Sequence, residues 1–426
     1  MMDTWLGLFC NTLPLSFPVS ARILSSSFSS SSSMAASSSH HRFHHHRRCY
    51  SNPNPPHPQP ALLVFSGGTA FNGVIEELKN FTNRVAHVLP VSDDGGSTAE
   101  IVRVLGGPAV GDIRSRCLRL SDQSTVEALA VRNLLGHRLP LDPSQAKSEW
   151  YSIVEGDHFL WKDVSKPYRE TIRAFLVYFQ SQILHRAEES FCFSNGSIGN
   201  FFFAGARIFL QSLDAAIFLF SRVSDIPPES LVLPVISTND RLTLGCELWD
   251  GTIIRGQNEI SHPTRGTIEL IKKGSFSTPA LPSRIKRVFY MSSEGKNLLH
   301  EVFPSVNAAV LEWLNNVDCI VYGMGSLFTS ICPSLVLLGI GEIISSRSCL
   351  KPNQYINTLL VPRNGEIPVD TDSLAAQGIF DVILVDSIRD PKVGIIYDPS
   401  SLIRSLADLT DRYMKSQVNG LIDTRR

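Results

Sequence analysis

The chain has 426 residues, of which 43% are hydrophobic, 19% charged and 9% aromatic, so it has enough apolar residues to bury a globular core. A formal net charge of −1 at pH 7 excludes a protein drawn to nucleic acid or to an anionic membrane by its overall charge, and any anionic ligand has to be held locally. No Cys-x-x-Cys pair indicates zinc, and polar residues interrupt the longest apolar stretch, 198–220, so we expect no membrane-spanning helix.

Residues 1–60 have the composition of a targeting segment. They contain one acidic residue, Asp3, against four arginines, and are rich in serine over 25–33 and 37–39. This composition is typical of an organellar transit peptide, and the prolines of 53–60 form an extended linker after it. We therefore expect residues 1–60 to be disordered outside the fold, and the protein to reach the chloroplast, with the mitochondrion as the alternative.

Two other interpretations of this segment remain open. An apolar region over 5–19 could belong to a secretory signal, but no positive charge precedes it and prolines interrupt it. The histidine tract over 40–46 could bind a metal, although in a removable leader compositional bias is the better explanation.

From residue 61 onward, short apolar runs alternate with helical patterns. Residues 62–65 form a strand that ends in a glycine turn, and apolar side chains then recur at helical spacing over 71–78. The same order repeats with a strand over 85–91 and a helix over 101–105. This alternation predicts an α/β fold with a Rossmann-like, doubly wound and mostly parallel sheet.

Two insertions are expected beside this sheet. An apolar helix face over 168–189 predicts a helical insertion, which we place at residues 138–190. Alternating residues on either side of Asp250-Gly251 predict a β-hairpin with a type I′ turn. We assign residues 61–415 to one domain and residues 416–426 to a C-terminal tail.

Glycine loops follow two of the expected strands, at the sheet edge where doubly wound folds bind ligands. Ser66-Gly67-Gly68-Thr69 precedes a helix, so its N–H groups could hold a phosphate, although a plain strand-to-helix turn explains it equally well. Gly323-Met324-Gly325-Ser326 could hold a second phosphate or a ribose. Asn200, in a turn of small residues, could bond a base or sugar, with helix capping as an equal alternative.

Acidic residues occupy two further turns. Asp93 and Asp94 directly follow a strand and would repel each other unless a cation or hydrogen-bond donors lie between them, which favours an Mg²⁺ site over simple helix capping. Asp112 follows Gly111, and the nearby guanidinium of Arg114 could grip a phosphate or pair with Asp112 at the surface. Arg116 offers a second guanidinium in the same turn.

These loops resemble the CofD and YvcK family in both content and order over residues 61–390. Met324 stands where the family usually has proline, and Ser66 and Ala70 stand where it usually has glycine. The blocks are Ser66-Gly67-Gly68-Thr69, Val91-Ser92-Asp93-Asp94-Gly95-Gly96-Ser97, Gly111-Asp112-Ile113-Arg114, Gly196-Ser197-Ile198-Gly199-Asn200 and Gly323-Met324-Gly325-Ser326-Leu327-Phe328-Thr329-Ser330.

The resemblance implies one of two activities. The CofD branch transfers a 2-phospholactyl group from a guanosine-diphosphate-linked donor to a deazaflavin hydroxyl with Mg²⁺, whereas the YvcK branch binds UDP-sugars as a regulator. By this resemblance Asp93 and Asp94 would hold Mg²⁺, and Asp94 and Asp112 are the candidate catalytic residues. The implied contacts to the nucleotide diphosphate are Gly67, Gly68, Thr69, Arg114, Asn200, Gly325 and Ser326.

Three hypotheses follow. The first is a transferase with a GDP-linked or other nucleotide-diphosphate donor and a deazaflavin-type acceptor. The second is a non-catalytic UDP-sugar-binding regulator of carbon metabolism. The third is a structural homologue with a decayed site, against which the clustered acids Asp94 and Asp112 argue. We expect no nucleic-acid or membrane partner, and a homodimer is compatible with each hypothesis.

Overall fold

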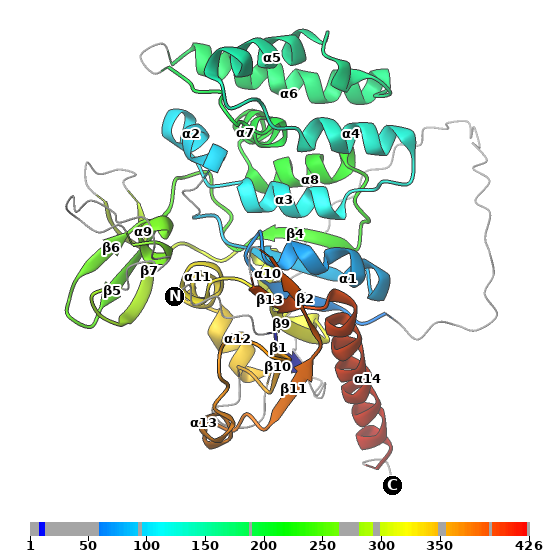
Figure 1. Ribbon diagram of the computed structural model, residues 1–426, viewed down its shortest axis with the longest axis vertical. Helices are drawn as coiled ribbons and strands as arrows, with labels where there is room; N and C mark the ends of the chain where they lie inside the picture. Colours follow the sequence, from blue (N-terminus) through cyan, green and yellow to red (C-terminus); the bar gives the residue numbers. More distant parts are fainter. Residues whose placement is uncertain are drawn as a thin grey trace, which may run out of the picture.

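The computed structural model describes residues 8–12, 59–92, 96–186, 190–263, 281–292, 299–347, 355–391 and 394–423. Within them the strands form sheets of seven, four and two strands (Figure 1). A helical lobe lies at one end of the seven-stranded sheet, beyond β4, and the four-stranded sheet projects to one side.

The seven-stranded sheet has the order β11-β10-β1-β9-β2-β3-β4. Strand β2 pairs in parallel with β3 and β9, β3 pairs in parallel with β4, and β10 pairs in parallel with β11. Without β1, the strands taken in chain order have the Rossmann arrangement 3-2-1-4-5-6. The expected Rossmann-like fold is confirmed, and its strand order reverses between β2 and β9. The strands are β1 (Leu8–Thr12), β2 (Leu62–Phe65), β3 (Val85–Leu89), β4 (Ser230–Pro234), β9 (Cys319–Tyr322), β10 (Thr358–Pro362) and β11 (Asp381–Val385).

Strand β1 departs from the sequence expectation. Residues 1–60 were expected to remain outside the fold, but Leu8–Thr12 pairs antiparallel with both β9 and β10. The physical reason is that β9 and β10 each present an edge of backbone N–H and C=O groups, which the backbone of β1 pairs. The rest of the expected leader, residues 1–7 and 13–58, lies outside the described residues.

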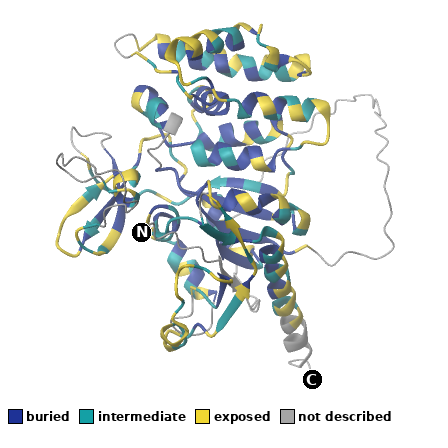
Figure 2. Cartoon of the chain, viewed as in Figure 1, coloured by how far each residue is buried: buried dark blue, intermediate teal, exposed yellow. Residues whose placement is uncertain are grey.

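Helices cover the buried central strands. All residues of β2, β3, β9 and β10 are buried, as expected for parallel strands with helices on both faces (Figure 2). Helix α1 packs against α3 and α14, and α10 packs against α12. Helix α14 continues to Asp423, so the expected tail over 416–426 is largely the end of a helix. These helices are η1 (Phe71–Val74), α1 (Ile75–Phe81), α10 (Ala308–Asn316), α11 (Cys332–Leu335), α12 (Ile340–Ser346), α13 (Thr371–Ala376) and α14 (Pro399–Asp423).

The crossover from β3 to β4 forms the helical lobe, and it extends well beyond the expected 138–190. Helix α6 packs on α7, and α7 packs on α8, which makes the lobe a single body. Aromatic rings join its helices: Trp150 of α5 lies edge-on to both Phe179 of α6 and Phe201 of α7. The helices of the crossover are α2 (Gly96–Leu105), α3 (Gly111–Leu120), α4 (Val126–Gly136), α5 (Pro143–Glu155), η2 (Phe159–Trp161), α6 (Lys166–Leu184), α7 (Ile198–Leu210) and α8 (Leu213–Val223).

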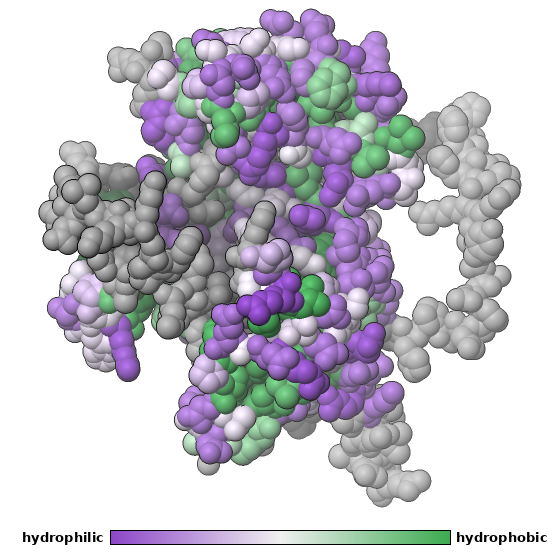
Figure 3. All heavy atoms as spheres, viewed as in Figure 1, coloured by the Kyte–Doolittle hydropathy of each residue, from purple (hydrophilic) through white to green (hydrophobic). Residues whose placement is uncertain are grey.

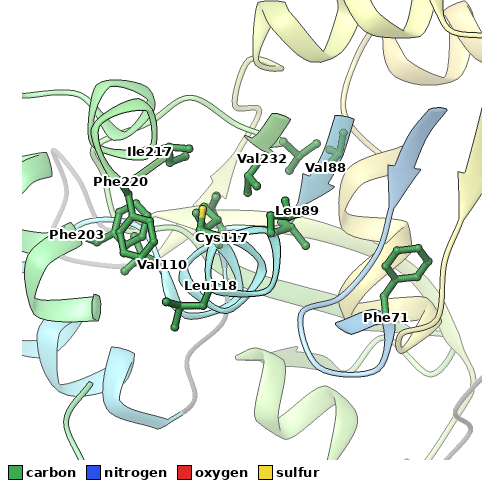
Figure 4. Packing of buried hydrophobic residues seen from close by; sticks show 14 of the residues in the cluster. Phe71, Val88, Leu89, Val110, Cys117, Leu118, Phe203, Ile217, Phe220 and Val232 are labelled. Carbon is green, nitrogen blue, oxygen red and sulfur yellow. The ribbon is translucent and has the colours of Figure 1, made fainter. Parts of the chain in front are cut away.

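Helix α3 connects this lobe to the sheet. In Figure 4, Cys117 of α3 and Leu89 of β3 face each other, and Val110 lies beside the rings of Phe203 and Phe220. Those two rings stack with centroids 4.5 Å apart. The buried core is therefore continuous from the sheet into the lobe.

The four-stranded sheet has the order β6-β5-β7-β8. The hairpin expected at Asp250-Gly251 is present, but its turn is not type I′. That turn needs a positive φ at both central residues, and here only Gly251 has one, at +86°. The Leu248 N–H donates to Thr252 O at 2.9 Å, which closes a loop of three residues with glycine at the left-handed position. The remaining elements are β5 (Thr243–Leu248), β6 (Ile253–Arg255), α9 (Gln257–Ser261), β7 (Ile285–Ser292), β8 (His300–Val302), η3 (Leu327–Ile331), β12 (Ser387–Asp390) and β13 (Gly394–Tyr397).

The surface is mixed in character. Hydrophilic side chains dominate the face of the helical lobe in Figure 3, whereas apolar side chains gather lower, in the region of α12, α13 and β11. Leu338, Phe380 and Leu384 are exposed there. Among the described residues no single helix is long and apolar enough to cross a membrane. The bent helix pair Leu327–Leu335 and Ile340–Ser346 is long and apolar enough when its two parts are taken together.

Candidate functional site

The glycine loops that follow β2 and β9 meet at the point where the strand order reverses. A Cβ added to Gly67 would lie 2.7 Å from Ser330 Oγ, and one added to Gly325 would lie 3.0 Å from the Gly67 nitrogen. Larger residues would therefore force the loops apart. The structure thus brings Gly67 and Gly325 together, and Ser326 follows at the N-terminus of the π-helix η3. In this fold class, ligands bind in the crevice at such a reversal point.

Asp112, the first acidic residue of α3, lies directly against the first loop. Its Oδ2 accepts the N–H of Gly68 at 3.1 Å. A Cβ on Gly68 would lie 1.9 Å from Asp112 Oδ1, so this contact requires glycine. A phosphate that approached the same N–H would meet the carboxylate, and the two anions would repel each other unless a cation lay between them.

Arg116 lies beneath the first loop and is fully buried. Its guanidinium donates to Ser66 Oγ at 3.2 Å, to Gly67 O at 2.9 Å and to Asn72 Oδ1 at 2.9 Å. Its Cζ lies 5.1 Å from the centre of the Phe71 ring. Arg116 therefore holds the loop from behind.

His87 of β3 completes this buried cluster. Its Nδ1 lies 3.0 Å from Arg116 Nη1, and since arginine can only donate, Nδ1 accepts. Burial, and then the charge of Arg116, lowers the pKa of His87 well below its usual value, so the ring is neutral. Burial lowers the pKa of Arg116 to about 10, against the opposing charge of Asp112. Sequence reasoning missed His87, whose only signal was a titratable residue inside an apolar strand.

Arg114 and Asn200 bind each other at the adjoining edge of the site. Arg114 Nε donates to Asn200 Oδ1 at 3.1 Å, and Asn200 Nδ2 donates to Thr98 Oγ1 at 3.4 Å. A Cβ on Gly111 would lie 2.8 Å from the same Thr98 oxygen. The N-termini of α2, α3 and α7 therefore converge, and each carries partial positive charge that favours an anion.

The remaining candidates differ in how far the structure addresses them. Thr69 is exposed at the end of the first loop, and its carbonyl accepts the N–H of Asn72. Asp93 and Asp94 lie outside the described residues, between β3 and α2. Over the part of the chain that is described, no group of three or more His, Cys, Asp or Glu side chains is placed to hold a metal ion. The magnesium site stays a prediction.

A cavity of about 330 Å³ lies along α2 beside these helix N-termini. Its size is in the range of small-molecule pockets, and both polar and apolar groups line it. The lining residues are Ala99, Glu100, Cys192, Ser194, Asn195, Gly196 and Phe201.

The fold is a Rossmann-like α/β fold, and two glycine loops meet at the point where its strand order reverses. Residues 62–406 match the family described as 2-phospho-L-lactate transferase CofD, and the chain belongs to this family. The resemblance stated from the sequence is thereby confirmed.

Relatives with curated descriptions fall in two groups. An uncharacterized protein of Saccharomyces cerevisiae is 34% identical over 353 residues, which span 70% of this chain and 77% of that protein. A gluconeogenesis factor of Halalkalibacterium halodurans is 27% identical over 330 residues, or 77% of this chain and 76% of the relative. The crystal structure of a UPF0052 family member from Bacillus halodurans aligns with a TM-score of 0.54 at 21% identity, covering 81% of this chain and 99% of the other, and it shares the fold.

Proposed function

We propose that this protein binds a nucleotide-diphosphate-linked donor, such as a GDP-linked one, and transfers a phospholactyl-like group from it to a hydroxyl acceptor of deazaflavin type. The observation that carries the proposal is the convergence of two glycine loops with the N-termini of α2, α3 and α7. Backbone N–H groups and helix dipoles directed at one place suit the charge of a diphosphate.

Within this proposal Asp112 and Asp94 are the acids nearest the chemistry. Asp112 lies at the Gly68 N–H, so its carboxylate would be close to the phosphate and could accept the proton of an attacking hydroxyl. Asp93 and Asp94 would share a Mg²⁺ ion, which would supply charge neutralisation at phosphorus. The Asp112 carboxylate suits such an ion, because a cation there would offset the repulsion between this carboxylate and the phosphate.

The acceptor would occupy the cavity along α2. Its volume of about 330 Å³ accommodates a fused-ring compound, and Ser194 and Asn195 offer polar contacts near the apolar edge of Phe201. Asn200 would orient the donor through its link to Arg114, which fixes the direction of the side-chain amide.

The second candidate is a non-catalytic UDP-sugar-binding regulator of carbon metabolism. It is favoured by the relatives described as gluconeogenesis factors, including that of Bacillus subtilis, 25% identical over 284 residues, or 67% of this chain and 63% of the relative. The same loops would hold the UDP diphosphate, and no group would be transferred.

Thermal unfolding with GDP, UDP, UDP-glucose and UDP-N-acetylglucosamine, each with and without Mg²⁺, separates the two candidates. A ligand that binds only the folded state raises its apparent stability. A shift selective for GDP and dependent on Mg²⁺ supports the transferase, and a UDP-sugar shift indifferent to metal supports the regulator. The absence of a shift with every nucleotide would refute nucleotide binding at this site.

We further propose that the protein acts in the chloroplast, with the mitochondrion as the alternative, on the composition of residues 1–60. A fluorescent fusion to the C-terminus of the full chain tests the address. Fluorescence that stays in the cytosol would contradict it.

A further inference from the structure

A second, smaller cavity lies on α2, between that helix and the start of β5. Its volume is about 60 Å³, and Ala99 lines both this cavity and the larger one. Ala99 directly follows Thr98, whose hydroxyl accepts from Asn200, so the small cavity adjoins the site. Its lining residues are Ser92, Ala99, Val102, Gly107, Ala109, Arg241, Leu242 and Thr243.

Ser92 points to a ligand at this place. The residue is 3% exposed, and its Oγ has no hydrogen-bond partner among the described residues. A buried hydroxyl left without a partner is costly, and such groups are rare unless something else satisfies them. Thr243 contributes a second hydroxyl-bearing side chain to the same wall.

Arg241 supplies the charge. Its side chain lines the cavity, and it has no hydrogen bond or ion pair with any residue in the described ranges. Most exposed arginines act as solvated surface charges, but this one lines the same cavity as the buried Ser92 hydroxyl, which has no partner among the described residues. A guanidinium presents donors in a planar fork that matches the two oxygens of a carboxylate.

Arg207 holds the walls of the cavity in place. It is 7% exposed, and it donates to Gly106 O at 3.0 Å and to Asn239 O at 3.4 Å. Gly107 packs so closely on its guanidinium that an added Cβ would lie 2.4 Å from Cζ. The turn at Gly106-Gly107 on one side of the cavity and the segment from Asn239 to Arg241 on the other are therefore fixed relative to each other.

The volume and lining select the kind of anion. A cavity of about 60 Å³ has room for several water molecules, since one water needs about 10–15 Å³ of such space. A carboxylate on a short carbon chain fits this space, with Val102, Ala109 and Leu242 against the carbon atoms. Inorganic phosphate has no carbon atoms to pack against these apolar side chains, so the lining favours a carboxylate on a carbon chain.

We propose that this cavity is a subsite for a small carboxylate, with Arg241 as its counter-ion and Ser92 as a hydrogen-bond donor. The proposal rests on the proposed function in one respect, since it assigns the carboxylate to the group carried by the nucleotide-linked donor. Arg241 is thereby a specificity-determining residue for that group.

Calorimetric titration of the full chain with sodium L-lactate, and separately with inorganic phosphate at matched ionic strength, tests the subsite. Lactate should bind the wild type. The Arg241→Gln substitution should weaken the affinity for lactate at least about tenfold, as expected for loss of a charge-assisted pair. Arg255→Gln is the matched control, because Arg255 is an exposed arginine of the same small sheet. Ser92→Ala should weaken the affinity for lactate several-fold.

Lactate binding that is absent, or that is equal in the wild type and Arg241→Gln, would overturn the subsite. So would an equal loss of lactate and phosphate in Arg241→Gln, which would indicate general attraction of anions. GDP with Mg²⁺ is titrated into the same proteins. If GDP binds and lactate does not, the subsite fails and nucleotide binding stands. If lactate binding depends on Arg241 and no nucleotide binds, the proposed function fails and the subsite stands.

Discussion

At the residue scale, the buried pair of Arg116 and His87 is the least expected feature of the site. A buried cation usually requires an anion in contact, but the described partners of Arg116 are the neutral oxygens of Ser66, Gly67 and Asn72 and the ring of His87. Asp112 acts on Arg116 from a distance. Arg116 therefore holds the first loop from one side through hydrogen bonds, while Asp112 contacts the N–H of Gly68.

Arg116→Lys should lower the free energy of unfolding by about 3 kcal/mol, because one ammonium cannot replace the planar fork and buried acceptors lose their partners. Chemical denaturation measures the change. Arg119→Lys is the control, since Arg119 is exposed on the same helix and should change stability by less than about 0.5 kcal/mol. Equal effects of the two substitutions would contradict the role of Arg116.

The neutral state of His87 makes stability depend on pH. Above about 6.5 the ring is neutral in both the folded and unfolded states and adds no pH dependence. As the pH falls below that value, the unfolded state binds a proton that the folded state refuses until its lowered pKa is reached. The free energy of unfolding should therefore decrease, by at most about 1.4 kcal/mol per pH unit from this group.

Denaturation curves at a series of pH values check this dependence. His87→Gln should flatten the decrease, because it removes the titrating ring. His185→Gln should leave the decrease intact, since His185 is exposed at the end of α6. A decrease of the same slope in His87→Gln and in the wild type would show that other groups cause it.

Asp112 should have opposite effects on nucleotide binding with and without metal. Its carboxylate repels a phosphate at the Gly68 N–H, so Asp112→Asn should strengthen GDP or UDP binding in EDTA by about three- to tenfold. With Mg²⁺ present the gain should vanish or reverse. Calorimetry measures both conditions, with Asp411→Asn, an exposed acid of α14, as the control. An equal change in nucleotide affinity in EDTA and with Mg²⁺ would show that Asp112 does not lie near the metal.

At the scale of elements, the close packing of α6 on α7 depends on one glycine. A Cβ on Gly205 would lie 2.2 Å from the carbonyl oxygen of Phe175, so the two helices could not keep their separation. Gly205→Ala should therefore lower stability by about 2 kcal/mol, although alanine otherwise favours a helix.

Gly73→Ala is the comparison for that experiment. Gly73 lies in η1, and an added Cβ there has no heavy atom within 4 Å, so this substitution should be neutral or raise stability by up to about 1 kcal/mol. Thermal and chemical unfolding of both variants provide the measurement. A neutral Gly205→Ala would show that α6 and α7 can shift without cost.

The glycine loops could be recognised from the sequence because they directly follow apolar strands. The contacts that require glycine could not be predicted, because Gly67 meets the side chain of Ser330 and Gly68 that of Asp112, both far away in the chain. The inward direction of Arg116 could not be predicted, because it depends on which face of α3 meets the sheet. The turn at Asp250-Gly251 was assigned wrongly because the Asp-Gly dipeptide is compatible both with a two-residue type I′ loop and with a three-residue loop that has glycine at its left-handed position.

At the scale of the whole molecule, the fold class could be predicted from the sequence but the extent of the lobe could not. Alternating strands and helices follow from hydrophobic period, and they gave the Rossmann-like class. The helical lobe exceeds residues 138–190 because α4, α7 and α8 join it through packing between distant segments, such as the stack of Phe203 on Phe220. No local pattern contains that information.

Strand β1 should contribute to the stability of the whole sheet. It pairs with β9 on one side and β10 on the other, so a chain that begins at residue 59 should unfold at a lower temperature than the full chain. Nucleotide affinity should stay unchanged, because β2 and β9 keep their own pairing. Unfolding temperatures and titrations of the two chains provide the test, and equal unfolding temperatures would show that β1 adds no stability to the sheet.

The position of β1 has a consequence for import if the chain is targeted to an organelle. If residues 1–60 are the address that their composition indicates, translocation needs them extended and accessible, whereas completion of the sheet encloses Leu8–Thr12 between two other strands. One molecule cannot do both at the same moment. In protein that folds before it reaches the organelle, part of the targeting segment would be enclosed in the sheet and inaccessible. The fraction imported would then depend on how soon β1 pairs with β9 and β10 after synthesis.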